Sequence, residues 1–142
     1  MRSRRVGSSR LVEGMESLIY LDTHAVVWLH SGQLGLFPQR ALDAVRDNAL
    51  FISPFVALEI QYLFETERIA FKSETVLNEL SDSLGLQVCK HDFNKVIAKS
   101  LNMNWTRDPF DRIITAQASI LNSALLTKDQ IIRKYYRYAF WD

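Results

Sequence analysis

From position 17 onward, short apolar runs alternate with longer stretches in which apolar residues recur at helical spacing. The runs predict strands at 18–21, 50–52, 86–89, 124–126 and 138–141, and helices are predicted at 22–30, 53–66, 73–85, 92–101, 108–122 and 129–135. Parallel strands need right-handed helical crossovers. The alternation therefore predicts an α/β fold, a three-layer sandwich whose mostly parallel central sheet of about four to five strands is flanked by helices.

Residues 1–16 have a different character, because they are rich in Arg, Ser and Gly and show no periodicity. We expect a flexible N-terminal extension there, followed by a single domain over residues 17–142. Met15 is an alternative start of the protein. A basic arm that touches RNA is the functional alternative for the extension.

The composition is that of an ordinary globular protein, with 48% hydrophobic and 23% charged residues. No apolar run approaches the roughly 20 residues of a membrane span, and the N-terminus lacks a secretory signal. We expect a soluble, cytoplasmic protein that does not contact a membrane. Cys89 is the only cysteine, which excludes an internal disulfide and a thiolate zinc site. The three histidines are too scattered to match a metal motif.

The net charge of +1 gives no general argument for a nucleic-acid partner. Four arginines and two glutamates in the first sixteen residues contribute +2, so the remainder carries −1. Any site for nucleic acid must therefore be local.

Two acids stand where a parallel sheet places its ligands, just beyond the carboxyl ends of strands. Asp22 follows the first predicted strand, and Asp129 follows the strand at 124–126 after Thr127 and Lys128. Each acid alone is explained as a helix N-cap. Together they are expected to face the same crevice.

Glu59 is the most informative acid, because it lies inside a predicted helix. Phe55, Glu59 and Leu63 form one stripe, flanked by Val56 and Tyr62, so the acid is expected at the centre of the apolar face. A carboxylate that faces a core costs several kcal/mol unless something neutralises it. A bound cation is one way to do so, and a paired core acid is the alternative.

The segment Arg107-Asp108-Pro109-Phe110-Asp111-Arg112 adds two more acids. Asp108 is a natural N-cap before a proline at the first helical position, and capping with the helix dipole accounts for both acids. Asp111 also lies three residues before Ile114, on the side expected to face the sheet. We therefore favour Asp111 over Asp108 as the inward-facing acid.

Several converging carboxylates repel one another, which suggests a hard divalent cation such as Mg²⁺ or Mn²⁺. Such a centre suits hydrolysis of a phosphodiester bond, because the cation lowers the pKa of a water and stabilises developing charge. Six basic residues are interleaved with the C-terminal acids: Arg107, Arg112, Lys128, Arg133, Lys134 and Arg137. They could contact flanking phosphates or an acidic partner, and a solvated surface is the alternative for each.

Four motifs together resemble those of PIN-domain proteins, and within that fold the VapC-type toxins of type II toxin–antitoxin pairs. They are Leu21-Asp22-Thr23-His24-Ala25, Ala57-Leu58-Glu59-Ile60, the segment from Arg107 to Ala118, and Leu125-Leu126-Thr127-Lys128-Asp129. The resemblance spans about residues 18 to 141, and its third motif is the most specific.

The resemblance implies a Mg²⁺- or Mn²⁺-dependent endoribonuclease that is usually a homodimer and is held inactive by a cognate antitoxin. Carried over position by position, it makes the catalytic and metal-binding quartet Asp22, Glu59, Asp111 and Asp129. Four further residues would support them: Thr23 and Thr127 as hydroxyls, Arg112 as a phosphate or antitoxin contact, and Asp108 as a cap. Relatives often carry histidine just before Arg-Asp-Pro, whereas this chain reads Asn104-Trp105-Thr106.

Rival interpretations fit less well. A haloacid-dehalogenase-like phosphatase needs a second acid two residues after the first, where this chain has His24, and a receiver domain needs adjacent acids there. A catalytically silent PIN-like module that binds RNA or protein stays open, although no ligand acid is missing. A helical assembly subunit also stays open, since Val26, Val27, Trp28 and Leu29 are apolar.

Overall fold

A computed structural model describes residues 17–142, so the extension predicted over 1–16 lies outside the described residues. The strands are β1 (Leu18–Leu21), β2 (Ala49–Ile52), β3 (Gln87–Val88), β4 (Ala124–Leu126) and β5 (Ala139–Phe140). The helices are α1 (Thr23–His30), the 3₁₀ helix η1 (Leu34–Leu36), α2 (Gln39–Asp47), α3 (Pro54–Glu65), α4 (Ser73–Leu84), α5 (Phe93–Ser100), α6 (Pro109–Ser119) and α7 (Gln130–Tyr135).

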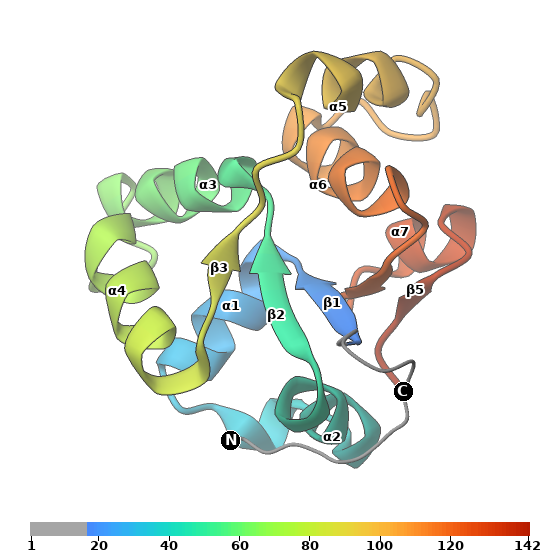
Figure 1. Ribbon diagram of the computed structural model, residues 1–142. Coiled ribbons are helices and arrows are strands. Elements are labelled where there is room, and N and C mark those ends of the chain that lie inside the picture. The colour runs from blue at the N-terminus through green and yellow to red at the C-terminus, as the bar shows by residue number, and fades with distance from the viewer. Residues whose placement is uncertain (1–16) are drawn as a thin grey trace.

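The five strands form one sheet in the order β3-β2-β1-β4-β5, and each neighbouring pair is parallel. Figure 1 shows this sheet in the middle, with α3 and α4 on one flank and α6 and α7 on the other. The predicted α/β class and the helix-flanked parallel sheet are thus confirmed. From β1 the chain first adds strands on one side and then, from β4, on the other. The order therefore reverses between β1 and β4, which is where an open parallel sheet binds its ligands.

Helix starts were predicted best, because side-chain caps mark them locally. Ser53 accepts a hydrogen bond from the Phe55 amide (3.1 Å) ahead of Pro54, and α4 ends at Gly85 in the left-handed region (φ 70°). The prediction missed η1 and α2. Helix α2 is amphipathic and buries Ala41 and Val45, so its apolar spacing was a signal that the sequence analysis did not use.

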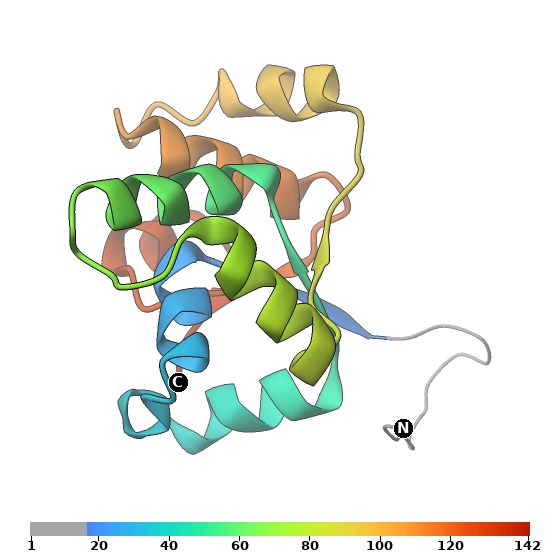
Figure 2. The same cartoon turned by 90° about the vertical axis from the view of Figure 1, so that its left-hand side faces the viewer.

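The core lies between the sheet and the helices and includes residues of β1, β2 and β4, together with the inner faces of α1, α3 and α4. A smaller cluster joins α5 to α6 through Val96, Ile113 and Ala116. Figure 2 shows α5 as the outermost helix, beyond α6. No helix within residues 17–142 has the length and apolar character needed to cross a bilayer.

Candidate active site

Asp22 and Thr127 meet at the point where the strand order reverses. In the β1–β4 pairing Leu21 lies opposite Leu126, so the next residue of each strand emerges at the same edge. The Thr127 hydroxyl donates to Asp22 Oδ2, and the Ala25 amide donates to Asp22 Oδ1 (3.0 Å), which caps α1. Asp22 is 8% exposed and Thr127 is fully buried. The side chains of two residues 105 positions apart are therefore held together.

Glu59 reaches the same region from α3, and the Thr23 hydroxyl donates to its Oε1. Its predicted place at the centre of the apolar face is wrong. The fully buried stripe of α3 consists of Val56 and Ile60, while Glu59 and Phe55 are half-buried beside it. The sequence pattern could not show this one-position offset, because both stripes of α3 are mostly apolar and tertiary packing decides which one faces the core.

Asp108 and Asp111 have different roles in the structure, one as a helix cap and the other as a partly buried acid. Asp108 Oδ1 accepts from the amides of Phe110 (2.8 Å) and Asp111 (3.3 Å), so it caps α6 as expected. The Asp111 carboxylate makes no hydrogen bond or ion pair to any residue in 17–142 and is partly buried, with Ile114 one turn further along α6 in the core. Asp111 is thus the inward-facing acid of this motif.

Asp129 follows β4 and caps α7. Its Oδ1 accepts from the amides of Ile131 (2.8 Å) and Ile132 (2.9 Å), and its own amide donates to Thr127 Oγ1 (3.0 Å). Among residues 17–142 nothing donates to its second oxygen, Oδ2. The cap and the site position predicted for Asp129 are therefore compatible, since one oxygen serves the helix and the other stays available.

The acids are near enough to raise one another's pKa. Burial raises the pKa of Asp111 to about 7, and the negative charges of Asp108, Asp129, Glu59 and Asp22 add to the rise in that order. Burial also raises the pKa of Asp22, against the lowering effect of its Thr127 hydrogen bond, and Asp129 raises it further.

Glu59 behaves in the same way. Burial is the main cause that raises its pKa and Asp108 adds to it, while the hydrogen bond from Thr23 lowers it. Asp111 thus lies within electrostatic reach of Asp22, Glu59 and Asp129. We call these four side chains the acid cluster.

Positive charge near the acid cluster is scarce. No lysine or arginine within residues 17–142 forms an ion pair with any of its members. The sequence analysis assigned His24 no chemistry, yet its side chain exerts a favourable electrostatic effect on both Asp22 and Glu59. The adjacency of His24 to Asp22 in the chain was the only signal that could have indicated it.

The donor atoms suit a hard cation, because the available ligands are carboxylate and hydroxyl oxygens. Glu59 Oε2, Asp129 Oδ2 and both oxygens of Asp111 accept no hydrogen bond from the described residues. As the side chains stand, however, no three acidic, histidine or cysteine residues in 17–142 are close enough together to hold a metal ion.

The supporting basic residue Arg112 has a partner already. Its Nε donates to the Thr106 carbonyl (2.8 Å), which ties α6 to the loop before it. Arg107 in that loop donates to the Asn104 carbonyl (3.0 Å). Both contacts stabilise the loop that leads to Asp108.

The family model of the PIN domain matches residues 19–138. The chain belongs to the PIN domain family. Among curated proteins, none is significantly similar to it. The match covers all four motifs of the acid cluster, so the family, first indicated by those motifs, is confirmed.

Two solved structures show the same PIN fold. The first is VapBC2 from Rickettsia felis bound to a DNA fragment from their promoter, with a TM-score of 0.61 and 17% identity over 88% of this chain and 99% of that one. The second is a domain of a functionally unknown protein from Methanocaldococcus jannaschii, with a TM-score of 0.56 and 19% identity over 89% and 91% of the two chains. At these identities the likeness concerns the fold.

Proposed function

We propose that this PIN domain is a Mg²⁺- or Mn²⁺-dependent endoribonuclease, a cytoplasmic VapC-type toxin whose catalytic and metal-binding residues are Asp22, Glu59, Asp111 and Asp129. The observation that carries the proposal is the acid cluster. Asp129, Glu59 and Asp22 raise the pKa of Asp111, Asp129 raises that of Asp22, and no lysine or arginine in residues 17–142 pairs with these four acids. A divalent cation removes that repulsion.

The residues of the chain have distinct parts in this proposal. Asp111, with no competing hydrogen bond in the described residues, and the second oxygen of Asp129 would bind the cation first. Thr127 and Thr23 orient Asp22 and Glu59 through their hydroxyl groups. When bound, Mg²⁺ or Mn²⁺ would lower the pKa of a water and stabilise charge on the phosphate.

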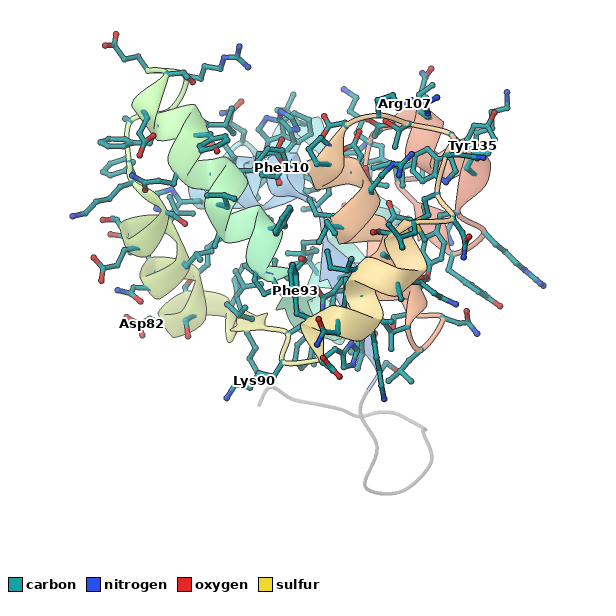
Figure 3. All side chains as sticks on the ribbon, turned by 90° about the horizontal axis from the view of Figure 1, so that it is seen from above. Asp82, Lys90, Phe93, Arg107, Phe110 and Tyr135 are labelled. Carbon is teal, nitrogen blue, oxygen red and sulfur yellow. The ribbon has the colours of Figure 1, made fainter. Side chains whose placement is uncertain are left out.

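Two partners belong to the same proposal. The structural likeness to VapBC2 supports a cognate antitoxin protein as a partner. A homodimer is supported by exposed apolar side chains beside an aromatic row between α3 and the α5–α6 pair, in which Phe55 packs 5.9 Å from Phe93 and 5.6 Å from Phe110 of the same chain, measured between ring centroids. Figure 3 shows Phe93 and Phe110 between these helices. Phe93 and Leu58 are more than 40% exposed and available to a second copy.

The test is cleavage of mixed cellular RNA by purified protein with Mg²⁺ or Mn²⁺, with EDTA, and after Asp22→Asn or Asp111→Asn. We expect metal-dependent cutting that falls more than about 100-fold in either variant, since even outer-shell partners of a metal site are worth about 10- to 100-fold. Asp142→Asn, which removes the exposed carboxylate paired with Arg133 and leaves the four acids of the cluster in place, is the matched control. Equal cutting by wild type and both variants would contradict the proposed site.

A catalytically silent PIN module is the second candidate, and one observation favours it. No three acids among the described residues are close enough to hold a cation in their present arrangement. The two candidates differ in outcome. The silent module binds RNA or protein without cutting under any divalent cation, whereas the nuclease cuts RNA when Mg²⁺ or Mn²⁺ is supplied.

A further inference from the structure

The loop between α5 and α6 carries an aromatic residue that the metal chemistry does not use. Trp105 lies two residues before Arg107 in this loop, and its ring stacks on Tyr135 of α7, with centroids 5.5 Å apart and planes 7° apart. Tyr135 is 52% exposed. A nearly parallel aromatic pair therefore lies at the surface with much of one ring open to solvent.

Both segments that form this pair also carry an acid of the site. The loop of Trp105 ends three residues later at Asp108, so at most about 10 Å of chain separates them. Helix α7 begins after Asp129 and ends at Tyr135, a rise of about 9 Å for its six residues. The stack thus lies within a few nucleotides' reach of the acid cluster.

Two cations accompany the pair. Lys134 Nζ lies 5.3 Å from the centroid of the Tyr135 ring, and Arg107 is exposed on the loop. Neither forms an ion pair with an acid in residues 17–142. Figure 3 shows Arg107 and Tyr135 on the same side of the view, opposite Lys90. The positive charges of Lys134 and Arg107 are available to an anionic ligand.

The loop is held in place before any ligand arrives. Arg112 Nε donates to the Thr106 carbonyl (2.8 Å), and Thr106 Oγ1 accepts from the Asp108 amide (3.2 Å). Arg107 Nη1 donates to the Asn104 carbonyl (3.0 Å). Trp105 therefore sits in the middle of a loop fixed on both sides, which lowers the entropy cost of presenting its ring.

We propose that Trp105 and Tyr135 form a stacking platform for an unpaired base of single-stranded RNA, with Lys134 and Arg107 contacting the adjoining phosphates. An exposed aromatic face beside unpaired cations matches the chemistry of an unpaired nucleotide. A duplex keeps its base faces stacked inside the helix and cannot use such a platform. The proposal rests on the proposed ribonuclease function and specifies the class of its substrate.

The experiment measures binding separately from cutting. In full-length protein carrying Asp111→Asn and kept in EDTA, fluorescence anisotropy gives the Kd for a fluorescein-labelled single-stranded RNA. The second probe is an abasic strand of equal length and charge. We expect Trp105→Ala and Tyr135→Leu to weaken binding of the RNA by about 5- to 100-fold and to leave the abasic strand within about twofold. Trp105→Phe keeps a ring and should stay near the parent affinity.

Tyr138→Leu is the matched control. Tyr138 is 39% exposed, and the guanidinium of its neighbour Arg137 lies 5.4 Å from its ring centroid, but it precedes β5, at the amino end of the strands. We expect no change in Kd for this variant. Thermal melting of each variant verifies that it is folded.

Three outcomes would overturn the platform: no binding of RNA by the parent protein, unchanged RNA affinity in both stack variants, or equal losses on RNA and abasic strands. Unchanged RNA affinity would assign the stack to a protein partner, and equal losses would mean that it only shapes the loop. The nuclease proposal can fail while the platform stands. That is the result if the wild-type protein cuts no RNA with Mg²⁺ or Mn²⁺ but binding still depends on the bases.

Discussion

The acid cluster, at the carboxyl ends of β1 and β4, and the β5 edge of the sheet differ in how their charged side chains are paired. At the carboxyl ends of β1 and β4, the acid cluster gathers negative charge with no lysine or arginine ion pair among residues 17–142. Beside β5, the lining of a hollow of about 600 Å³ includes Arg40 and Arg133 together with the acid Asp142. Arg133 pairs with Asp142 (3.4 Å), and the Arg40 guanidinium lies 5.1 Å from the Phe140 ring centroid while donating to the Asp142 carbonyl.

This difference separates a part of the protein that serves stability from a part that serves a ligand. Burial raises the cost of each ionised carboxylate, and neighbouring acids raise it again. Carboxylates with pKa values raised in this way are concentrated at functional sites. At the β5 edge, by contrast, Asp142 is contacted by both Arg133 and Arg40 of the same chain. Changes at the two places should therefore have opposite consequences, and the following predictions run from the largest expected effect to the smallest.

The strongest prediction concerns the hydroxyl that orients Asp22. Thr127→Val removes the donor to Asp22 Oδ2, and we expect cleavage to fall by about 10- to 100-fold, as for outer-shell partners of other metal sites. Thr127→Ser keeps the hydroxyl and should retain most of the activity. Initial cleavage rates at saturating Mn²⁺ are the measurement. Equal rates for Val and Ser would show that the hydrogen bond has no part in catalysis.

Addition of the cation should stabilise the fold, because a ligand that binds only the native state shifts unfolding by mass action. At about ten times its Kd, Mg²⁺ or Mn²⁺ should add about 1.4 kcal/mol and raise Tm by about 3–6 °C relative to EDTA. Asp111→Asn should abolish this shift, and Asp142→Asn should preserve it. A shift of the same size in both variants would place the cation elsewhere.

The raised pKa of Asp111 predicts a pH dependence of the metal-free protein. The pKa rises from 3.8 to about 7 in the native state, so the unfolded chain loses this proton first as pH increases. Stability in EDTA should therefore fall between about pH 4 and pH 7. Cation binding should strengthen over the same interval, because protons compete for Asp111.

Asp111→Asn should remove this part of the fall. We expect the metal-free variant to gain about 1–2 kcal/mol over wild type at pH 8, since solvent screening at a partly exposed carboxylate reduces the full effect. At pH 4 both proteins are uncharged at this position and should differ little. Urea unfolding at both pH values measures the gain. A loss of equal size at both pH values would refute the electrostatic explanation.

The smallest effect is expected at the β5 edge. Asp142→Asn removes the carboxylate that pairs with Arg133, and exposed ion pairs contribute about 0–1 kcal/mol. We expect the free energy of unfolding in EDTA to fall by less than about 1 kcal/mol, a change opposite in sign to that of Asp111→Asn. The loss should become smaller in high salt, because salt screens the ion pair. A gain in stability would remove the contrast between the two regions.

The sequence alone determined the features that depend on neighbouring residues. The caps at Ser53, Asp108 and Asp129 mark helix starts, because a short polar side chain bonds to amides two or three residues further on. The positions of acids after strands followed from the apolar runs. Those two signals were enough for the α/β class, the helix-flanked sheet and the positions of Asp22 and Asp129, whereas Glu59 and Asp111 were identified from helix faces and from the resemblance to PIN-domain proteins.

Only the tertiary structure decided the features that join distant segments. The bond from Thr127 to Asp22 depends on the β1–β4 register, and that from Thr23 to Glu59 on how α3 packs. Which stripe of α3 is buried and the stacking of Trp105 on Tyr135 depend on the same packing. The physical reason is that a residue's local pattern specifies its secondary structure and one face, whereas its partner is chosen by the packing of the whole domain.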